Sequence, residues 1–474
     1  MRLTALALAI VSVTTQVLQA QRPDSLGEEV RKYVALDTTA VALTHVLLVD
    51  GTGAPPRPDQ TVIIQQGRIT RVGPAGNARV PTGAVSMDLN GHTLIPGLIG
   101  LHNHLFYTAA GGRAAQMSYT GPRLYLASGV TTIRTAGGRS PYAEINLREN
   151  INRGLVPGPH IHLTAPYITG VEGGGSMDVV TSPEEARRFV AYWASEGATW
   201  IKAYTDIGRA ELGAAIKEAH RRGVKVTGHL CSVSFREAVE LGIDNLEHGM
   251  LTASDFDPSK QPDVCPVATI GRNNLADVRS ETAKSVIQKM VRRKVSMTST
   301  LAVYEPFVAG RPTKDPRVLN AMSPEVRTSY LKIRNEIDSI GSGPIGTEGL
   351  QSAMAFEKEF VEAGGLLAAG VDPTGLGGAL AGYGDQRNYE LLIEAGFSPA
   401  QTIQIMTLNG ARILGVQQRL GSVEAGKLAD LVVLKGDLTS RPAVIRNPTI
   451  VFKDGVGYDP AKLIASIEGR VGID

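Results

Sequence analysis

Short apolar segments alternate with helical segments along residues 96–415 of this 474-residue chain. Residues 182–196 and 209–222 are two of the predicted helices. The first begins with Ser182 and Pro183 and then two acidic residues, and the second carries its aliphatic residues on one face. A long series of βα units of this kind predicts an α/β protein with a (β/α)8 TIM barrel. The predicted barrel strands are 96–104, 131–135, 161–165, 200–204, 224–229, 245–248, 295–299 and 366–372.

Segments of turns and strands flank the predicted barrel on both sides. Residues 41–93 alternate short strands with turns, which predicts an antiparallel β region, and residues 416–474 return to the same pattern. Because the two ends of a barrel lie close together, we expect these segments to pair as the two halves of a small β-sandwich. The predicted catalytic barrel is residues 94–415, and residues 1–20 are a predicted signal peptide.

The first twenty residues resemble a secretory signal. Arg2 provides a positive start, an apolar run covers residues 3–15, and the candidate cleavage site follows Ala20. The site is imperfect because Leu18, third before the cut, is not small. The run is too short and too rich in Thr for a membrane span. We therefore predict export to the periplasm or the outside, with no membrane span in the mature chain.

Composition narrows the class of partner. The net charge is +2, from 48 basic and 46 acidic residues, which argues against a nucleic-acid partner and favours a small-molecule substrate. The chain has two cysteines, Cys231 and Cys265. Two cysteines do not make a disulfide framework, so we interpret both as ordinary thiols of the core or of a loop.

Candidate metal ligands lie at the ends of the predicted strands. His102 and His104 are separated by one residue, so on a strand both side chains point to the same side. A His-x-His pair alone also fits two exposed loop histidines. However, chemistry in a barrel collects at the carboxyl ends of its strands, where further candidates lie. These further candidates are Lys202, His229, His248 and Asp372.

The remaining histidines serve as a comparison. His160 and His162 also form a His-x-His pair, but they open a predicted strand and so lie toward the other end of the barrel. His220 lies at a solvated helix end, and His45 and His92 lie in the N-terminal β region. We interpret all five as structural or surface residues.

Lys202 is an unusual member of the set. An ammonium group cannot bind a metal ion, and burying it beside cations costs free energy. Reaction with CO2 would convert Nζ into a carbamate, whose two oxygens can bridge two metal ions. The alternative is an ordinary lysine paired with Asp206 or Asp372.

Several motifs together resemble the amidohydrolase superfamily. The resemblance covers nearly the whole chain after the predicted signal, and it is closest to the imidazolonepropionase-like group with metal-dependent dipeptidases and ochratoxin-type amidases. The motifs are Pro96-Gly97-Leu98-Ile99-Gly100-Leu101-His102-Asn103-His104, residues 129–134, Glu247-His248-Gly249, Gly370-Val371-Asp372, and residues 407–411, 421–423 and 429–431.

This resemblance implies a binuclear metal site. One divalent ion would lie on His102, His104 and Asp372, a second on His229 and His248, and carboxylated Lys202 would bridge them, which completes the six ligands. Zinc is the metal expected for such ligands. The resemblance also implies a metal-bridging hydroxide as nucleophile, Asp372 as the catalytic group that moves its proton, and a homo-oligomer.

Two departures from the family pattern concern the substrate. Thr135 stands where relatives often carry Asp, and residues 171–175 stand where relatives often have Gly-Gly-His-Gly. Three tyrosines follow predicted strands and are candidate substrate contacts, with packing as the alternative; they are Tyr107, Tyr204 and Tyr304. The segments 251–278 and 306–349 also follow strands, so we expect them to cover the active face.

The leading functional hypothesis is hydrolysis of an amide bond in a small molecule, such as a dipeptide or an N-acyl amino acid. The alternative is a mononuclear cyclic amidohydrolase of the imidazolonepropionase type. A deaminase is disfavoured because such relatives usually carry Glu three residues after the histidine that corresponds to His229, where this chain has Ser232. A non-catalytic oligomeric relative would have lost ligands, and this chain retains all six.

Overall fold

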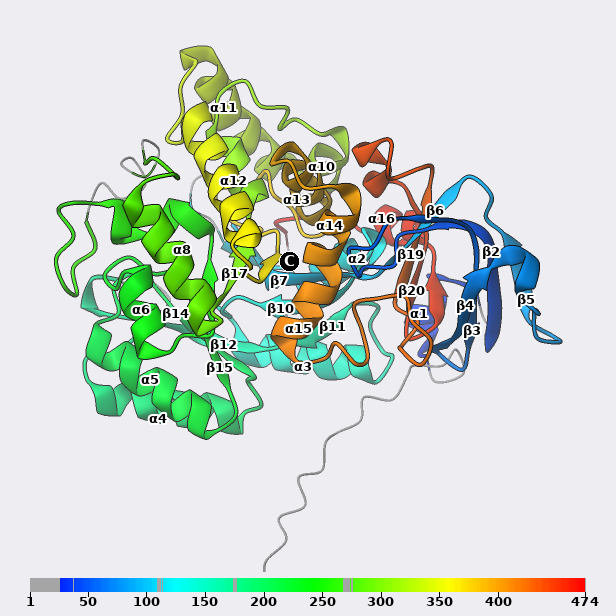
Figure 1. Ribbon diagram of the computed structural model, residues 1–474, viewed down its shortest axis with the longest axis horizontal. Coiled ribbons are helices and arrows are strands. Elements are labelled where there is room, and N and C mark those ends of the chain that lie inside the picture. Colours follow the sequence, from blue (N-terminus) through cyan, green and yellow to red (C-terminus); the bar gives the residue numbers. More distant parts are fainter. Residues whose placement is uncertain are drawn as a thin grey trace, which may run out of the picture.

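The computed structural model describes residues 26–36, 38–108, 112, 114–173, 177–266, 273 and 276–473. Figure 1 shows a barrel of strands surrounded by helices, with a second group of strands beside it at the right of the view. The predicted signal peptide, residues 1–20, lies outside the described residues.

The barrel strands are parallel and close on themselves. Neighbouring strands pair in chain order, and β18 pairs with β7 to complete the ring. The third position is shared by β11, which pairs with β10, and β12, which pairs with β14; only Leu163 separates these two segments. The predicted (β/α)8 barrel is therefore confirmed. Its strands are β7 (Leu98–Asn103), β10 (Val130–Thr135), β11 (His160–His162), β12 (Thr164–Thr169), β14 (Trp200–Ala203), β15 (Lys225–Gly228), β16 (Asn245–Glu247), β17 (Ser296–Ser299) and β18 (Leu367–Ala369), and the short β13 (Asp178–Val179) pairs parallel with the end of β12.

Helices follow the barrel strands and pack outside them (Figure 1). The Ser182 hydroxyl accepts a hydrogen bond from the Glu185 backbone N–H at 3.3 Å, so it caps α4 as its sequence predicts. Helix α5 buries its predicted aliphatic face, including Leu212 and Ile216. These helices are α2 (Thr120–Ala127), α3 (Pro141–Asn152), α4 (Pro183–Ser195), α5 (Arg209–Arg221), α6 (Phe235–Leu241), α8 (Glu281–Arg293), α12 (Thr347–Glu362) and α13 (Tyr383–Glu394), and α14 (Pro399–Gln404), η7 (Ile405–Asn409) and α15 (Gly410–Leu414) come next.

The N- and C-terminal segments pair with each other, as expected, and their strands are joined in one sheet. Strand β19 (Leu431–Lys435) pairs antiparallel with β6 (His92–Pro96), and β6 leads through Gly97 into the first barrel strand. The expectation of a wholly antiparallel region is wrong. β5 (Val85–Asp88) and β6 lie one after the other along β2 (Ala40–Leu48), and both run parallel to it. The other strands are β1 (Val34–Leu36), β3 (Arg57–Gln65), β4 (Arg68–Pro74), β20 (Pro448–Lys453) and β21 (Val456–Tyr458), with the short helices α1 (Glu28–Arg31), η2 (Ala75–Asn77), η8 (Pro442–Arg446) and α16 (Pro460–Ala465).

Cys231 and Cys265 form a disulfide, so the interpretation of both as ordinary thiols is wrong. Cys231 follows β15, and Cys265 lies in the segment after β16. Because β15 and β16 are parallel neighbours, the segments that follow them leave the barrel at the same edge. This adjacency in space is not visible from a sequence separation of 34 residues.

Insertions follow the carboxyl ends of several barrel strands. The segment after β17 is largely helical, with its longest helix at the top of Figure 1. Part of the segment after β16 lies outside the described residues. Within the part of the chain that the structure describes, no helix has the length and apolar character to cross a membrane. The elements of these segments are η4 (Gly249–Thr252), η5 (Ser254–Phe256), α9 (Leu301–Tyr304), η6 (Glu305–Phe307), α10 (Pro316–Ala321) and α11 (Pro324–Ile340); β8 (Phe106–Thr108) and β9 (Ala114–Gln116) follow β7, and η3 (Val171–Gly173) follows β12.

Candidate metal centre

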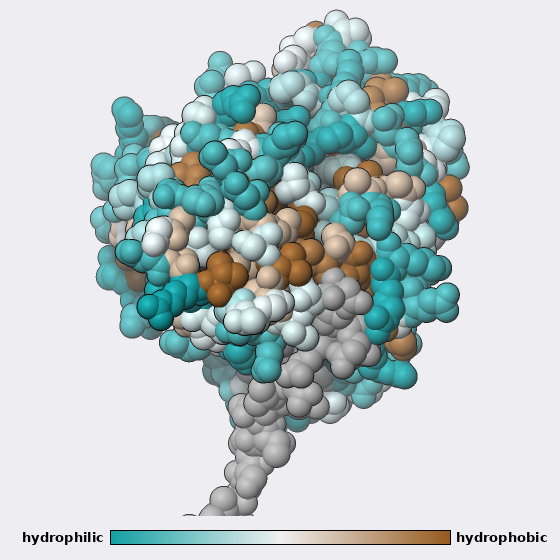
Figure 2. Space-filling view, turned by 90° about the vertical axis from the view of Figure 1, so that its right-hand side faces the viewer, coloured by the Kyte–Doolittle hydropathy of each residue, from teal (hydrophilic) through white to brown (hydrophobic). Residues whose placement is uncertain are grey.

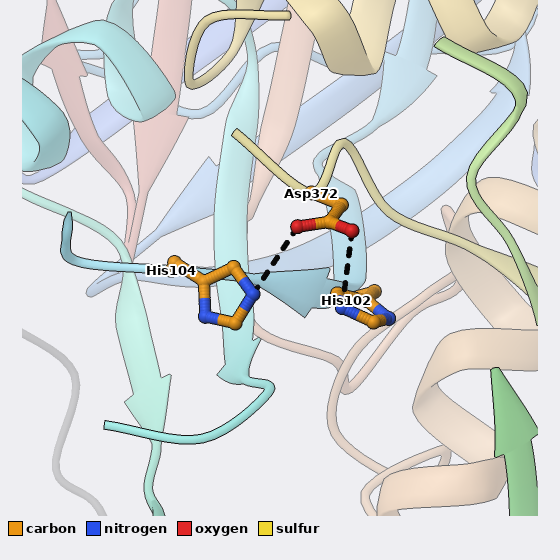
Figure 3. A group of neighbouring side chains, drawn as sticks. All are labelled: His102, His104 and Asp372. Atoms are coloured by element: carbon orange, nitrogen blue, oxygen red, sulfur yellow. Dashed lines mark ion pairs between the residues drawn. The ribbon is translucent and has the colours of Figure 1, made fainter. Parts of the chain in front are cut away.

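His102, His104 and Asp372 form a compact buried group at the carboxyl ends of two paired strands (Figure 3). His102 Nε2 lies 3.6 Å from Asp372 Oδ2, and His104 Nε2 lies 3.3 Å from Asp372 Oδ1. One ligand atom from each residue lies within 4.8 Å of the other two. Three donors this close together, two imidazoles and a carboxylate, suit one divalent cation.

The other two histidines of the predicted set join this group. His248 Nε2 lies 3.9 Å from Asp372 Oδ2, and the His248 ring centroid lies 4.4 Å from that of His102. The His229 ring centroid lies 4.4 Å from that of His248, and His229 is partly exposed toward the mouth. The four histidines therefore form a continuous row of rings at one end of the barrel.

Lys202 lies fully buried on β14. Burial lowers the pKa of Lys202 to about 8, and the charges of Glu247 and Asp372 only partly oppose this effect. Its Nζ is buried and has no hydrogen-bond partner. A lowered pKa leaves a larger fraction of the amine unprotonated than in an exposed lysine. The unprotonated amine is the form that reacts with CO2.

The donor atoms of the histidines are prepared for a cation. His102 Nδ1 donates to Glu247 Oε2 at 2.8 Å, His104 Nδ1 to the Gly137 carbonyl oxygen at 3.2 Å, and His248 Nδ1 to Thr300 Oγ1 at 2.7 Å. When Nδ1 carries the proton, Nε2 holds a lone pair directed at the centre. His248 Nε2 is buried without a hydrogen-bond partner, like Lys202 Nζ. These orphaned atoms fit the metal ions that the donor set implies.

Burial and nearby charges favour the neutral form of three of these imidazoles. Burial, together with the charge of Lys202, holds the pKa of His102 well below its usual range and lowers that of His229 to about 3. Burial and the neighbouring His229 likewise hold the pKa of His248 well below its usual range. A neutral imidazole is the form that binds metal.

Two of the candidate ligands have an unusual backbone. Asp372 has φ 48° and His248 has φ 67°, the left-handed region that non-glycine residues seldom adopt. The Asp372 backbone N–H donates to the His102 carbonyl oxygen at 2.8 Å, and Thr374 Oγ1 donates to Asp372 Oδ1 at 2.8 Å. These bonds hold the carboxylate toward the histidines, and such strain is typical of functional sites.

Residues 93–256 and 356–464 match the sequence pattern of the amidohydrolase family, which is more than half of the chain. The chain belongs to the amidohydrolase family. It is therefore an enzyme that acts on carbon–nitrogen bonds, and the family depends on metal. Residues 257–355 fall between the two matched parts; they include α10, α11 and Cys265.

Known proteins resemble this amidohydrolase along most of its length. A dihydroorotase of Pelotomaculum thermopropionicum is 23% identical over 395 residues, which is 80% of this chain and 86% of the relative. A protein of Bifidobacterium longum assigned as a prolidase is 27% identical, with a TM-score of 0.63 over 90% of this chain and 98% of its own. A Xaa-Pro dipeptidase is 21% identical, with a TM-score of 0.65 over 89% of this chain and all of its own, which shows the shared fold alone.

Glu247 accepts several buried hydrogen bonds beside the candidate ligands, and its sequence motif alone did not predict this role. Besides His102 Nδ1, its carboxylate accepts hydrogen bonds from Arg134, from the Thr227 hydroxyl, and from Asn245 Nδ2 at 3.1 Å. Burial would raise the pKa of Glu247, but the charges of Arg134 and Lys202 outweigh it and the net shift is downward. The sequence does contain a signal for this pair, because Arg134 and Glu247 each lie inside a buried strand. A buried charge needs a partner of opposite charge.

The three predicted substrate tyrosines have different surroundings. The Tyr204 ring centroid lies 4.8 Å from that of His229, and the Tyr304 centroid lies 5.6 Å from that of His248. The Tyr107 hydroxyl donates to the Gly377 carbonyl oxygen at 2.7 Å. A fourth tyrosine, Tyr167, was missed: its ring centroid lies 6.2 Å from that of His104. Contact of Tyr107, Tyr204 and Tyr304 with substrate stays a prediction.

Proposed function

We propose that this amidohydrolase hydrolyses the amide bond of a dipeptide or an N-acyl amino acid at a binuclear zinc centre. The observation that carries the proposal is Lys202, a lysine with a fully buried, unpartnered Nζ in the interior of a barrel whose mouth holds four histidines and Asp372. A buried amine with no partner costs free energy unless it is modified or paired. Carboxylation would turn it into the bridging anion that two cations need.

The proposed ligand sets follow the geometry. His102, His104 and Asp372 would hold one ion. His229 and His248 would hold the other ion, and carboxylated Lys202 would bind both ions. Two bound cations would lower the pKa of water and polarise the scissile carbonyl. Asp372 would accept the proton of the attacking water and give it to the leaving amine, and Glu247 and Thr300 would keep His102 and His248 oriented.

The test is the metal content of protein purified with zinc and bicarbonate. We expect about two zinc ions per chain in the wild type and one or none in Lys202→Ala, with loss of amidase activity. Nuclear magnetic resonance after growth with ¹³C-bicarbonate should show a carbamate signal in the wild type alone. Lys225→Ala, at the opening end of the neighbouring strand, is the matched control and should keep both ions.

The alternative proposal is a mononuclear cyclic amidohydrolase. The similarity to a dihydroorotase over 80% of the chain supports this alternative. One zinc ion in both the wild type and Lys202→Ala, with turnover of cyclic amides but not of dipeptides, would favour it over the binuclear reading.

We also propose that the mature protein is exported and forms a homo-oligomer. The Cys231–Cys265 disulfide supports export, because disulfides persist mainly outside the reducing cytoplasm. Figure 2 shows a band of hydrophobic residues across a face that is otherwise largely hydrophilic, which supports self-association. N-terminal sequencing of protein recovered from the periplasm or medium, and light scattering of the purified protein, test the two proposals.

A further inference from the structure

Arg139 is an exposed arginine beside the metal centre. It follows β10 at the carboxyl end of the barrel, and its guanidinium carbon lies 4.9 Å from the centroid of the Phe106 ring. The Phe106 centroid in turn lies 4.5 Å from that of His104. Two consecutive ring contacts therefore connect this cation to a candidate metal ligand.

Arg139 has no acidic partner among the described residues. Arg134, five residues earlier, is fully buried and paired with Glu247. Of the acids near the mouth, Asp372 is held by the histidines. Glu144 is buried with no hydrogen-bond partner on either carboxyl oxygen, and burial raises its pKa well above the usual range. The guanidinium is thus held against a ring while its N–H donors stay available to an incoming anion.

Tyrosine rings continue the surface from Arg139 toward the second pair of histidines. The Tyr167 centroid lies 6.5 Å from that of Phe106 and 5.2 Å from that of Tyr204, and Tyr204 stands beside His229. The positive charge of Arg139 opposes the rise in pKa that burial causes in Tyr167 and Tyr204, so its field reaches both rings. Together these rings form an apolar wall that ends in a cation at one side and in imidazoles at the other.

Close packing of the chain gives this wall its shape. Gly137 has φ 106°, and a Cβ atom there would lie 2.7 Å from the Tyr167 ring. Only glycine lets the strand end approach the ring this closely while its carbonyl oxygen accepts from His104 Nδ1. Arg139 comes two residues later, so the same turn places the guanidinium at the edge of the wall.

We propose that Arg139 is the specificity-determining residue that binds a carboxylate of the substrate, with the apolar part of the substrate against Phe106, Tyr167 and Tyr204. The inference rests on the proposed amidase function and assigns its anionic group to one side chain. A guanidinium presents paired N–H donors that match the two oxygens of a carboxylate. In an N-acyl amino acid the carboxylate lies one carbon from the scissile nitrogen, so one ligand can reach both groups.

The experiment compares N-acetyl-L-phenylalanine with N-acetyl-L-phenylalaninamide, which has the same shape and no charge. We expect the zinc-loaded wild type to favour the acid in kcat/KM by about 10- to 100-fold, the range of a charge-assisted hydrogen bond. Arg139→Gln should lose most of this preference through a higher KM for the acid, with the amide unchanged. Arg139→Lys should lie between them because it keeps the charge and loses the planar fork.

The matched control is Arg153→Gln, because Arg153 is also exposed and follows α3 toward the opposite end of the barrel. It should keep the wild-type preference. An equal loss for acid and amide in Arg139→Gln, or no loss for either, would overturn the assignment.

The carboxylate site can also be tested if the amidase proposal fails. If the wild type cleaves neither compound, binding of N-acetyl-L-phenylalanine is measured by calorimetry in the same proteins. Tighter binding to the wild type than to Arg139→Gln by tenfold or more would support the carboxylate site. Equal binding would overturn it.

Discussion

Among the residues that the structure describes, two buried clusters combine histidine with aspartate, and they behave in opposite ways. The first is His102, His104 and Asp372 at the mouth of the barrel. The second is formed by His160, which opens β11, with Asp430 and Asp454 of the terminal sheet. The first cluster contains both histidines of a His-x-His pair, and the second contains the first histidine of another such pair. Each cluster also contains an aspartate in the left-handed backbone region, Asp372 in the first and Asp454 in the second.

The charges around the imidazole separate the two clusters. His160 Nε2 lies 3.5 Å from Asp430 Oδ2 and 3.3 Å from Asp454 Oδ1. Burial lowers the pKa of His160, but the two carboxylates outweigh it and raise the pKa to about 9. Lys453 Nζ, 3.4 Å from Asp454 Oδ2, completes a group of two cations and two anions. This cluster is thus a balanced set of ions that joins barrel to sheet.

At the mouth, two carboxylates, Asp372 and Glu247, face four imidazoles and two buried cations, Lys202 and Arg134. Burial and Lys202 therefore keep His102 neutral, with a lone pair on Nε2. The comparison teaches that residue types alone do not distinguish a ligand from an ion pair. The balance of carboxylates against the surrounding imidazoles and buried cations decides whether the imidazole offers a lone pair or a positive charge.

Asp372→Asn should give the largest effect and would break the comparison most directly. Loss of the carboxylate removes a proposed ligand and the proposed proton acceptor, so we expect activity to fall by roughly 10²–10⁴-fold or more. Steady-state kinetics and zinc content measure this. Asp430→Asn is the matched change in the other cluster and should keep kcat and zinc; a similar loss of zinc there would show that both clusters bind metal.

His160→Gln should destabilise the fold and leave the chemistry intact. Without its imidazolium, two buried carboxylates face only Lys453, which should cost about 3 kcal/mol in the free energy of unfolding. Urea denaturation of wild type and variant measures the difference. Unchanged stability, or a lower zinc content at unchanged kcat, would contradict the ion-pair assignment.

Glu247→Gln should act on the mouth cluster through His102. The amide can still accept from His102 Nδ1, but the buried Arg134 loses its counter-charge, so we expect zinc affinity to fall by about 10- to 100-fold. Competition with a chelator measures the affinity. Glu237→Gln, a partly exposed helix-capping acid, is the control and should bind zinc as the wild type does.

The smallest effect should be a dependence of stability on pH. The pKa of His160 is about 9 in the folded protein and near 6.5 when unfolded, so the stabilising charge is fully present below pH 6.5. It is lost as the pH rises through about 9. The stability difference between wild type and His160→Gln should therefore shrink between pH 6.5 and pH 9.5 in urea titrations. A constant difference over this range would mean that His160 is not charged.

The sequence by itself determined the barrel and the convergence of the histidines and Asp372. Strand period and strand order place residues 102, 104, 229, 248 and 372 at strand ends, and parallel strands bring those ends together. Strand period and strand order are properties of the sequence itself. They predict the convergence of these side chains without knowledge of which residues contact one another.

Only the tertiary structure decided which side chains meet as partners. The Glu247–Arg134 pair, the cluster at His160 and the Cys231–Cys265 bond join residues far apart along the chain. His160 is positively charged and His102 is neutral, because Asp430 and Asp454 of the terminal sheet lie beside His160. The physical reason is that pKa, hydrogen bonding and disulfide formation depend on distance in space, which local periodicity does not contain.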